Sequence, residues 1–168
     1  VGWEPLARIV RMRTQVRRAA QSPDPASAAA ALEELPRTER EFKRLFDEFS
    51  DAVSYKQKFL DSNAFLVYYT RGFDGPGRPP IEGAVERETL QFGARNDAWV
   101  ALDDARAELD DLLDPDADYR DTTDLRRSLK AALAAFDAYL AHAPPALVTE
   151  AANLAESRAP PDQQLPQR

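Results

Sequence analysis

The carboxylates between residues 103 and 124 are the first candidates for chemistry in this sequence. Asp114, Asp116 and Asp118 alternate as they do in the opening of a calcium-binding loop, where carboxylate oxygens surround a hard cation. The later positions of such a loop do not follow, because Tyr119 stands where a glycine makes the turn and Leu125 where a bidentate glutamate belongs. We therefore interpret the segment as a solvated turn between helices and expect no metal site.

Two further arrangements resemble catalytic or metal-binding groups. The pairs Asp103-Asp104 and Asp110-Asp111 lack the Glu-x-x-His spacing of a di-metal helical bundle, which favours the water-exposed face of a helix. His142 is the single histidine in a chain without cysteine, and its place near a predicted helix end favours capping over catalysis. No phosphate-binding glycine loop, dinucleotide fingerprint or serine nucleophile elbow is present. We predict a protein with no catalytic residue and no cofactor, and not an enzyme.

Charge is distributed unevenly along the chain. The sequence has 22 basic and 29 acidic residues, and its net charge of −7 disfavours binding to a nucleic acid backbone. Residues 96–124 carry eleven acids and two arginines, whereas the first twenty residues carry one acid and five arginines: Arg8, Arg11, Arg13, Arg17 and Arg18. These arginines are a candidate secondary, electrostatic contact with an acidic partner.

Apolar periodicity predicts an all-α protein. Helical patterns cover residues 3–21, 26–35, 38 to about 60, 81 or 83 to about 113, 122–142 and 146–157. We expect an up-down four-helix bundle with an additional N-terminal helix. Residues 1–158 would form the bundle domain, with a long Gly/Pro-rich irregular loop at about 61–82, and residues 159–168 a disordered tail.

Specific side chains define the expected helix starts and core faces. Thr38 and Glu41 have the spacing of a capping box, and good N-cap residues occupy 121–124. Three core stripes follow at three- and four-residue steps: Phe42, Leu45, Phe46 and Phe49; Leu90, Ala94, Ala98, Leu102, Ala105, Leu109 and Leu112; and Leu125, Leu129, Leu133, Phe136 and Leu140.

The Gly/Pro-rich loop is the main candidate for partner binding. Residues 71–80 contain three glycines and three prolines, and such long irregular segments are often functional. Phe59, before the loop, and Phe65, within it, are interpreted as core. Aromatic and arginine side chains together are typical of interface hot spots, and the predicted contact set is Tyr68, Tyr69, Arg71, Phe73 and Arg78. The longest apolar run, 64–69, is far shorter than the roughly 20 residues of a membrane-spanning helix.

Several strings resemble a known family. They are residues 54–60 (SYKQKFL), 63–78 (NAFLVYYTRGFDGPGR), 91–99 (QFGARNDAW) and 102–109 (LDDARAEL), and the resemblance covers about residues 42–140. The family is that of the small thylakoid-lumen proteins of plants and green algae that maintain photosystem II under high light. The PsbQ-like helical bundles of the lumen are the nearest similar family.

The resemblance implies a place and a partner. It implies an auxiliary assembly or repair factor in the chloroplast thylakoid lumen that binds photosystem II core subunits on their lumenal face. The factor would be peripheral to the membrane through protein contacts, with Val1 following a removed transit peptide. Two alternatives stay open: a permanent extrinsic structural subunit of a photosynthetic complex, and a small-ligand-binding helical domain.

The loop hypothesis predicts the behaviour of a double charge reversal. Arg71→Glu combined with Arg78→Glu should abolish co-purification with photosystem II cores, because both guanidinium groups are expected to pair with partner carboxylates. The thermal melt should be unchanged. Retained binding would remove the loop from the proposed interface.

Overall fold

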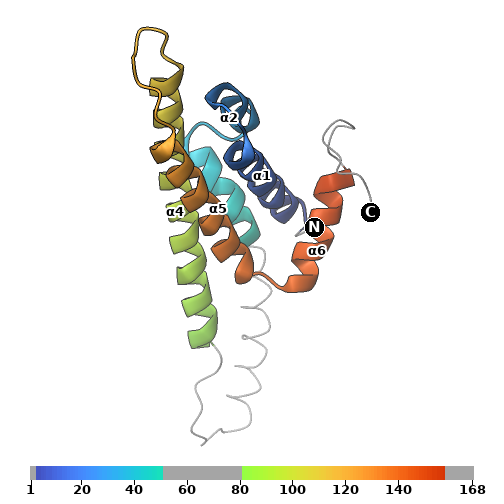
Figure 1. The fold of residues 1–168 in the computed structure, drawn as a ribbon. Helices are drawn as coiled ribbons and strands as arrows, with labels where there is room; N and C mark the ends of the chain where they lie inside the picture. The colour runs from blue at the N-terminus through green and yellow to red at the C-terminus, as the bar shows by residue number, and fades with distance from the viewer. Residues whose placement is uncertain (1–2, 51–80, 158–168) are drawn as a thin grey trace, which may run out of the picture.

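The chain forms α-helices throughout the part that the structure describes. The computed structural model describes residues 3–50 and 81–157, apart from the side chains of Trp3 and of residues 81–88. The helices are α1 (Trp3–Gln21), α2 (Pro25–Leu32), a helical segment at 39–50, α4 (Ile81–Leu113), α5 (Thr123–Ala141) and α6 (Pro145–Ser157) (Figure 1). The predicted all-α class is confirmed, and α1, α4, α5 and α6 match the predicted helices within about one residue at each end.

The described helices pack in a connected series. α4 and α5 run antiparallel and form the most extensive pair, α1 packs on α5, and α6 packs on α1 (Figure 1). α2 bridges α1 and α4 at one end of the molecule. α4 begins at Ile81, so the last two residues of the loop predicted at 61–82 are helical. The rest of that loop, the continuation of the third helix to residue 60 and the tail at 159–168 lie outside the described residues.

An aromatic cluster joins the 39–50 helix to α4 and α5. The Phe42 and Phe46 rings lie 4.9 Å apart between centroids, and both contact Phe136 of α5, at 6.0 and 5.6 Å. Trp99 of α4 contacts Phe42 at 5.4 Å, and Tyr139 of α5 packs edge-on against Phe46 at 4.7 Å. Such pairs each add about 0.5–1.5 kcal/mol beyond the apolar area that they bury. The predicted aromatic stripe is therefore the centre of the core.

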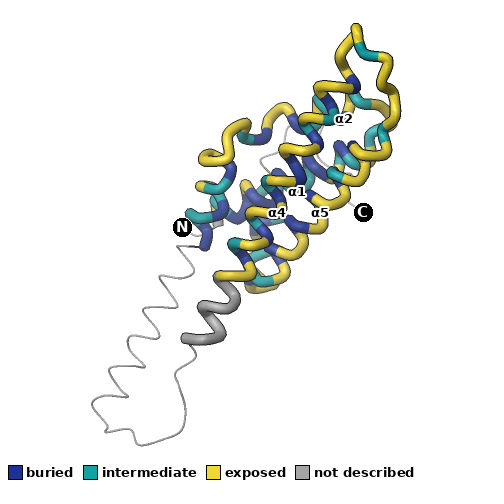
Figure 2. Tube along the Cα trace, turned by 90° about the vertical axis from the view of Figure 1, so that its left-hand side faces the viewer, coloured by how far each residue is buried: buried dark blue, intermediate teal, exposed yellow. Residues whose placement is uncertain are grey.

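Most of the predicted core stripe of α4 is buried, but Leu90 is not. Every stripe residue from Ala94 to Leu112 is buried, whereas the Leu90 side chain is 49% exposed. The prediction for Leu90 is wrong because, at 100° per residue, the stripe residues from Ala94 to Leu112 span an arc of about 80°, and Leu90 lies about 40° outside that arc. Gln91, one residue later, is 5% exposed and takes the inward position. Figure 2 shows the alternation of buried and exposed positions along α4 and α5.

Side chains cap the helix ends as the sequence suggests, with one difference. Thr38 Oγ accepts a hydrogen bond from the Glu41 backbone N–H at 3.2 Å, as expected for half of a capping box. At α5 the N-cap residue Thr122 makes no side-chain capping bond. The carboxylate of Asp121 instead accepts from the Thr123 N–H at 2.9 Å and from its hydroxyl at 2.7 Å.

Arg106 fastens the end of α2 to α4. Its guanidinium donates to the backbone carbonyl oxygens of Leu35 at 3.0 Å and Pro36 at 2.7 Å, and more weakly to that of Leu32 at 3.5 Å. These carbonyls belong to the last turn of α2 and the chain after it, where helical partners run out. The negative end of the α2 helix dipole also stabilises the positive charge of Arg106 at this place.

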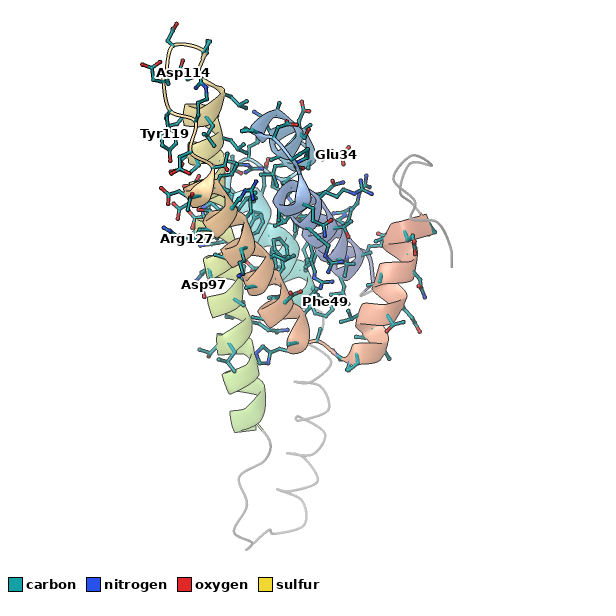
Figure 3. The ribbon with its side chains drawn as sticks, in the orientation of Figure 1. Glu34, Phe49, Asp97, Asp114, Tyr119 and Arg127 are labelled. Carbon is teal, nitrogen blue, oxygen red and sulfur yellow. The ribbon has the colours of Figure 1, made fainter. Side chains whose placement is uncertain are left out.

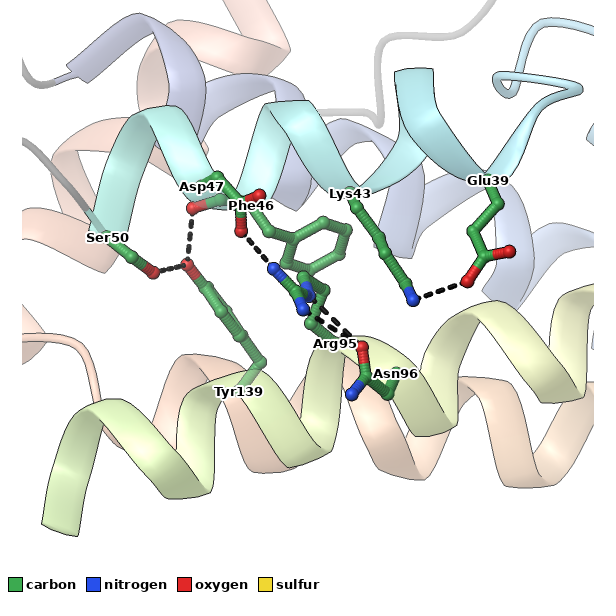
Figure 4. Close-up of polar contacts among 8 residues, drawn as sticks. All are labelled: Glu39, Lys43, Phe46, Asp47, Ser50, Arg95, Asn96 and Tyr139. Carbon is green, nitrogen blue, oxygen red and sulfur yellow. Dashed lines mark hydrogen bonds and ion pairs between the residues drawn. The ribbon is translucent and has the colours of Figure 1, made fainter.

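The buried hydroxyl of Tyr139 gives a direct test of the core. It bonds to Ser50 Oγ at 2.8 Å and donates to the Phe46 carbonyl at 3.0 Å (Figure 4). Tyr139→Phe should lower the free energy of unfolding by about 1–2 kcal/mol, because the buried Ser50 hydroxyl loses its partner. Urea denaturation measures the change. Tyr119→Phe, at an exposed tyrosine, is the matched control and should cost under about 0.5 kcal/mol. Equal losses in both variants would contradict the interpretation.

Candidate partner-binding surfaces

The predicted main contact set cannot be placed on a surface. Tyr68, Tyr69, Arg71, Phe73 and Arg78 all lie outside the described residues. The interpretation of the loop as a docking element therefore stays a sequence-based prediction.

The five arginines of α1 differ in what they contact. Arg8 and Arg17 are exposed and make no ion pair with the described residues. Arg11 pairs with Glu34 at 3.3 Å, across to the chain after α2, and Arg13 donates from Nε to Asp137 of α5. Arg18 is half-buried and also has an interaction partner. Of the arginines predicted as a secondary electrostatic contact, Arg11 and Arg13 therefore form ion pairs within the protein that hold α1 in place.

A groove lined by arginines runs between α1 and α6. We call it the arginine groove; its volume is about 280 Å³, and its lining includes the side chains of Arg11, Arg13, Thr14, Arg17, Arg18 and Glu156. Ala152 and Ala155 of α6 complete the opposite wall. Four guanidinium groups against one carboxylate make this the most basic of the grooves described here. Small alanine side chains on α6 leave room beside the long arginines of α1.

Helix geometry explains how the arginines surround this groove. At 100° per residue, Val10, Thr14 and Gln21 fall on one line along α1. Arg13 and Arg17 fall on one side of that line, and Arg11 and Arg18 on the other. The groove therefore has basic side chains along both of its edges.

A second groove lies on another side of α1. Its volume is about 400 Å³, and it is lined by Arg8, Arg11, Met12, Gln15, Glu34, Leu35, Pro36 and Leu45. The Arg11–Glu34 ion pair belongs to this lining, so one of its two arginines is already paired. It is less basic than the arginine groove.

A third groove, between α2 and α4, has mixed charge. Its volume is about 640 Å³, and it is lined by alanines of α2, by Leu109 and Leu113, and by charged groups that include Arg37, Arg106 and Asp103. Burial lowers the pKa of the Arg106 guanidinium, and the nearby positive charge of Arg37 lowers it further. Arg106 is already bound to backbone carbonyls, which leaves its structural role as the one that the geometry supports.

The acidic residues between 97 and 124 lie on the outside of α4 and at its turn into α5. Asp114 Oδ1 accepts from the Asp116 N–H at 2.9 Å, which makes a local turn, and Figure 3 shows Asp114 and Tyr119 at the end of this hairpin. Asp103, Asp104, Asp110 and Asp111 are exposed, as predicted. Within residues 3–50 and 81–157, no group of three or more His, Cys, Asp or Glu side chains is arranged to hold a metal ion.

Two groups near this turn have shifted pKa values. Loss of hydration, followed by the nearby carboxylates led by Glu108, raises the pKa of the Tyr119 hydroxyl. Hydrogen bonds from the side chain and the backbone of Thr123 lower the pKa of the Asp121 carboxyl.

His142 is the C-cap residue of α5, and its backbone N–H bonds to the carbonyls of Tyr139 and Leu140. His142 therefore lies at the end of a helix, as predicted from the sequence.

Comparisons with known proteins add no relative. No family model matches the chain, and neither a curated protein nor a solved structure matches it. None of the described helices combines the length and the apolar character that crossing a membrane requires.

The capping carboxylate of Asp121 predicts a pH-dependent stability difference. Because its folded-state pKa is lower than its ordinary value of 3.8, its contribution is present above that pH and is lost as the pH falls through the folded value. Asp121→Ala should therefore lower Tm at pH 7, and the difference from wild type should shrink in acid. Thermal melts over a pH series measure this. A difference from wild type that stays constant over the whole pH series would contradict the capping role of the carboxylate.

Proposed function

We propose that the protein is a non-catalytic auxiliary factor that docks on the lumenal side of photosystem II during assembly or repair. The resemblance, which covers about residues 42–140, supplies the place, the chloroplast thylakoid lumen, and the partner, the photosystem II core subunits. Within the described residues the proposal is supported by one observation: arginines concentrate on α1, and acidic side chains concentrate on α4 and its turn into α5. Segregated charge of this kind steers and orients a docking protein on a charged partner.

The exposed arginines of α1 are suited to a transient interaction with a partner. Arg8 and Arg17 are free of ion pairs with described residues, so they can meet partner carboxylates without breaking the fold. Exposed charge pairs contribute modestly to affinity and depend on salt, which favours rapid association over permanence. Transient docking suits an assembly or repair factor better than a permanent subunit.

The alternatives predict different observations. A permanent extrinsic subunit would be present in mature complexes in a fixed ratio, whereas an assembly or repair factor would be found only with intermediates.

The groove between α2 and α4, at about 640 Å³, has a size usual for small-ligand sites and favours a ligand-binding domain as the second candidate. Its charged lining is mixed in sign, and Arg106 there is already bound to backbone.

Charge reversal on α1 tests the docking proposal. Arg8 and Arg17 are nine residues apart and project from opposite sides of α1, so the double variant Arg8→Glu with Arg17→Glu changes whichever side faces the partner. It should weaken binding to isolated photosystem II cores by roughly tenfold, because an attractive contact becomes repulsive. Co-sedimentation at increasing salt measures the affinity, and wild-type binding should fall as salt rises.

The matched control makes the same change in net charge elsewhere. Arg40→Glu with Arg126→Glu alters two exposed arginines outside α1 and should bind like wild type. All three proteins should melt alike, because none of the four side chains is buried. Equal loss in the control pair, or binding insensitive to salt, would remove α1 from the interface.

A further inference from the structure

We infer that the arginine groove between α1 and α6 binds an extended, acidic peptide segment of a partner protein. The inference rests on the proposed docking function and names the chemistry of the partner at one contact. It requires basic donors that remain free, a groove long enough for a peptide, and spacing that fits carboxylate side chains.

The groove keeps hydrogen-bond donors for a ligand. A guanidinium carries five N–H donors. Arg11 gives one, from Nη2, to Glu34, and Arg13 gives one, from Nε, to Asp137. These ion pairs fix both guanidinium groups at the edges of the groove, with side chains 39% and 29% exposed. Arg17 is exposed and has no ion pair within the described residues, so it is the donor best placed to receive a carboxylate.

The length of the groove favours a peptide over a small anion. Its lining on α1 extends from Val10 to Gln21, which at 1.5 Å per residue is about 16 Å. A phosphate or a single carboxylate would occupy only a fraction of that length. An extended chain rises about 3.3 Å per residue, so about five residues span it.

The spacing of the arginines matches an extended acidic chain. Arg13 and Arg17 are four residues apart on one face of α1, a rise of about 6 Å. Side chains at alternate positions of an extended peptide are about 6.6 Å apart. Acidic residues at every second position can therefore reach successive guanidinium groups, which bind carboxylates well because their donors form a planar fork.

Glu156 of α6 opposes this ligand. Its carboxylate lines the same groove and repels an incoming acidic side chain. Removing that charge should therefore strengthen binding. A residue with only a structural role would not produce this gain.

The test uses the full chain and a fluorescent peptide that alternates serine and glutamate, with a serine–glutamine peptide as its control. The glutamate peptide should bind and the glutamine peptide should not. Arg17→Gln should weaken binding about fivefold to tenfold, the loss of one charge-assisted hydrogen bond at an exposed site. Glu156→Gln should tighten it, and Arg40→Gln, at an exposed arginine outside the groove, should leave it unchanged. Fluorescence anisotropy measures the affinity of the wild type for both peptides and of the three variants for the glutamate peptide.

Specific outcomes overturn the inference. Wild-type affinity in Arg17→Gln, or no gain in Glu156→Gln, would show that the peptide binds elsewhere. Complete displacement of the peptide by inorganic phosphate at equal concentration would show a small-anion site instead. If the peptide fails to bind while wild-type protein still co-sediments with photosystem II cores, the groove inference falls and the docking proposal stands. If the peptide binds as expected and co-sedimentation fails, the choice of photosystem II as partner falls.

Discussion

The contact between Tyr139 and the 39–50 helix is the constraint on which the other helix positions depend. The side chain is fully buried, its ring packs edge-on against Phe46, and its hydroxyl reaches Ser50 and the Phe46 carbonyl. A tyrosine in this position fixes both the distance between the helices and their register, because the ring sets the first and the hydrogen bonds set the second. α5 carries Tyr139 and also contacts α4 and α1, so this contact connects the 39–50 helix to both of those helices.

The sequence predicted the helices well because their signals are local. Capping residues, prolines and apolar periodicity act within a few residues, and they located α1, α4, α5 and α6 closely. Contacts between distant residues were not predictable. Tyr139 was absent from the predicted stripe of α5 although it is fully buried, and the three carbonyl partners of Arg106 lie about 70 residues away in the chain. Leu90 was assigned to the core from its four-residue spacing to Ala94, but its angle on the helix turns it outward.

The candidate site was predictable in composition but not in arrangement. The five arginines of α1 read as one basic cluster in sequence, yet the fold divides them between ion pairs, grooves and solvent. The pair between Arg13 and Asp137 joins residues 124 positions apart, and no local pattern reveals such a partner. The α6 wall of the arginine groove, formed by Ala152, Ala155 and Glu156, also could not be predicted from the sequence. The apolar pattern of a short helix does not show against which other helix it packs.

The stability of α6 ought to depend on what occupies the arginine groove. Isolated helices of about this length are marginal in water, so α6 depends on its packing against α1. Only Ala151 of α6 is fully buried, and Leu147, Val148 and Leu154 are partly so. A ligand that contacts both walls binds only the docked arrangement, and by mass action it must favour that arrangement over any in which α6 has separated. Docking of a partner and ordering of α6 are therefore linked, and each should strengthen the other by the same free energy.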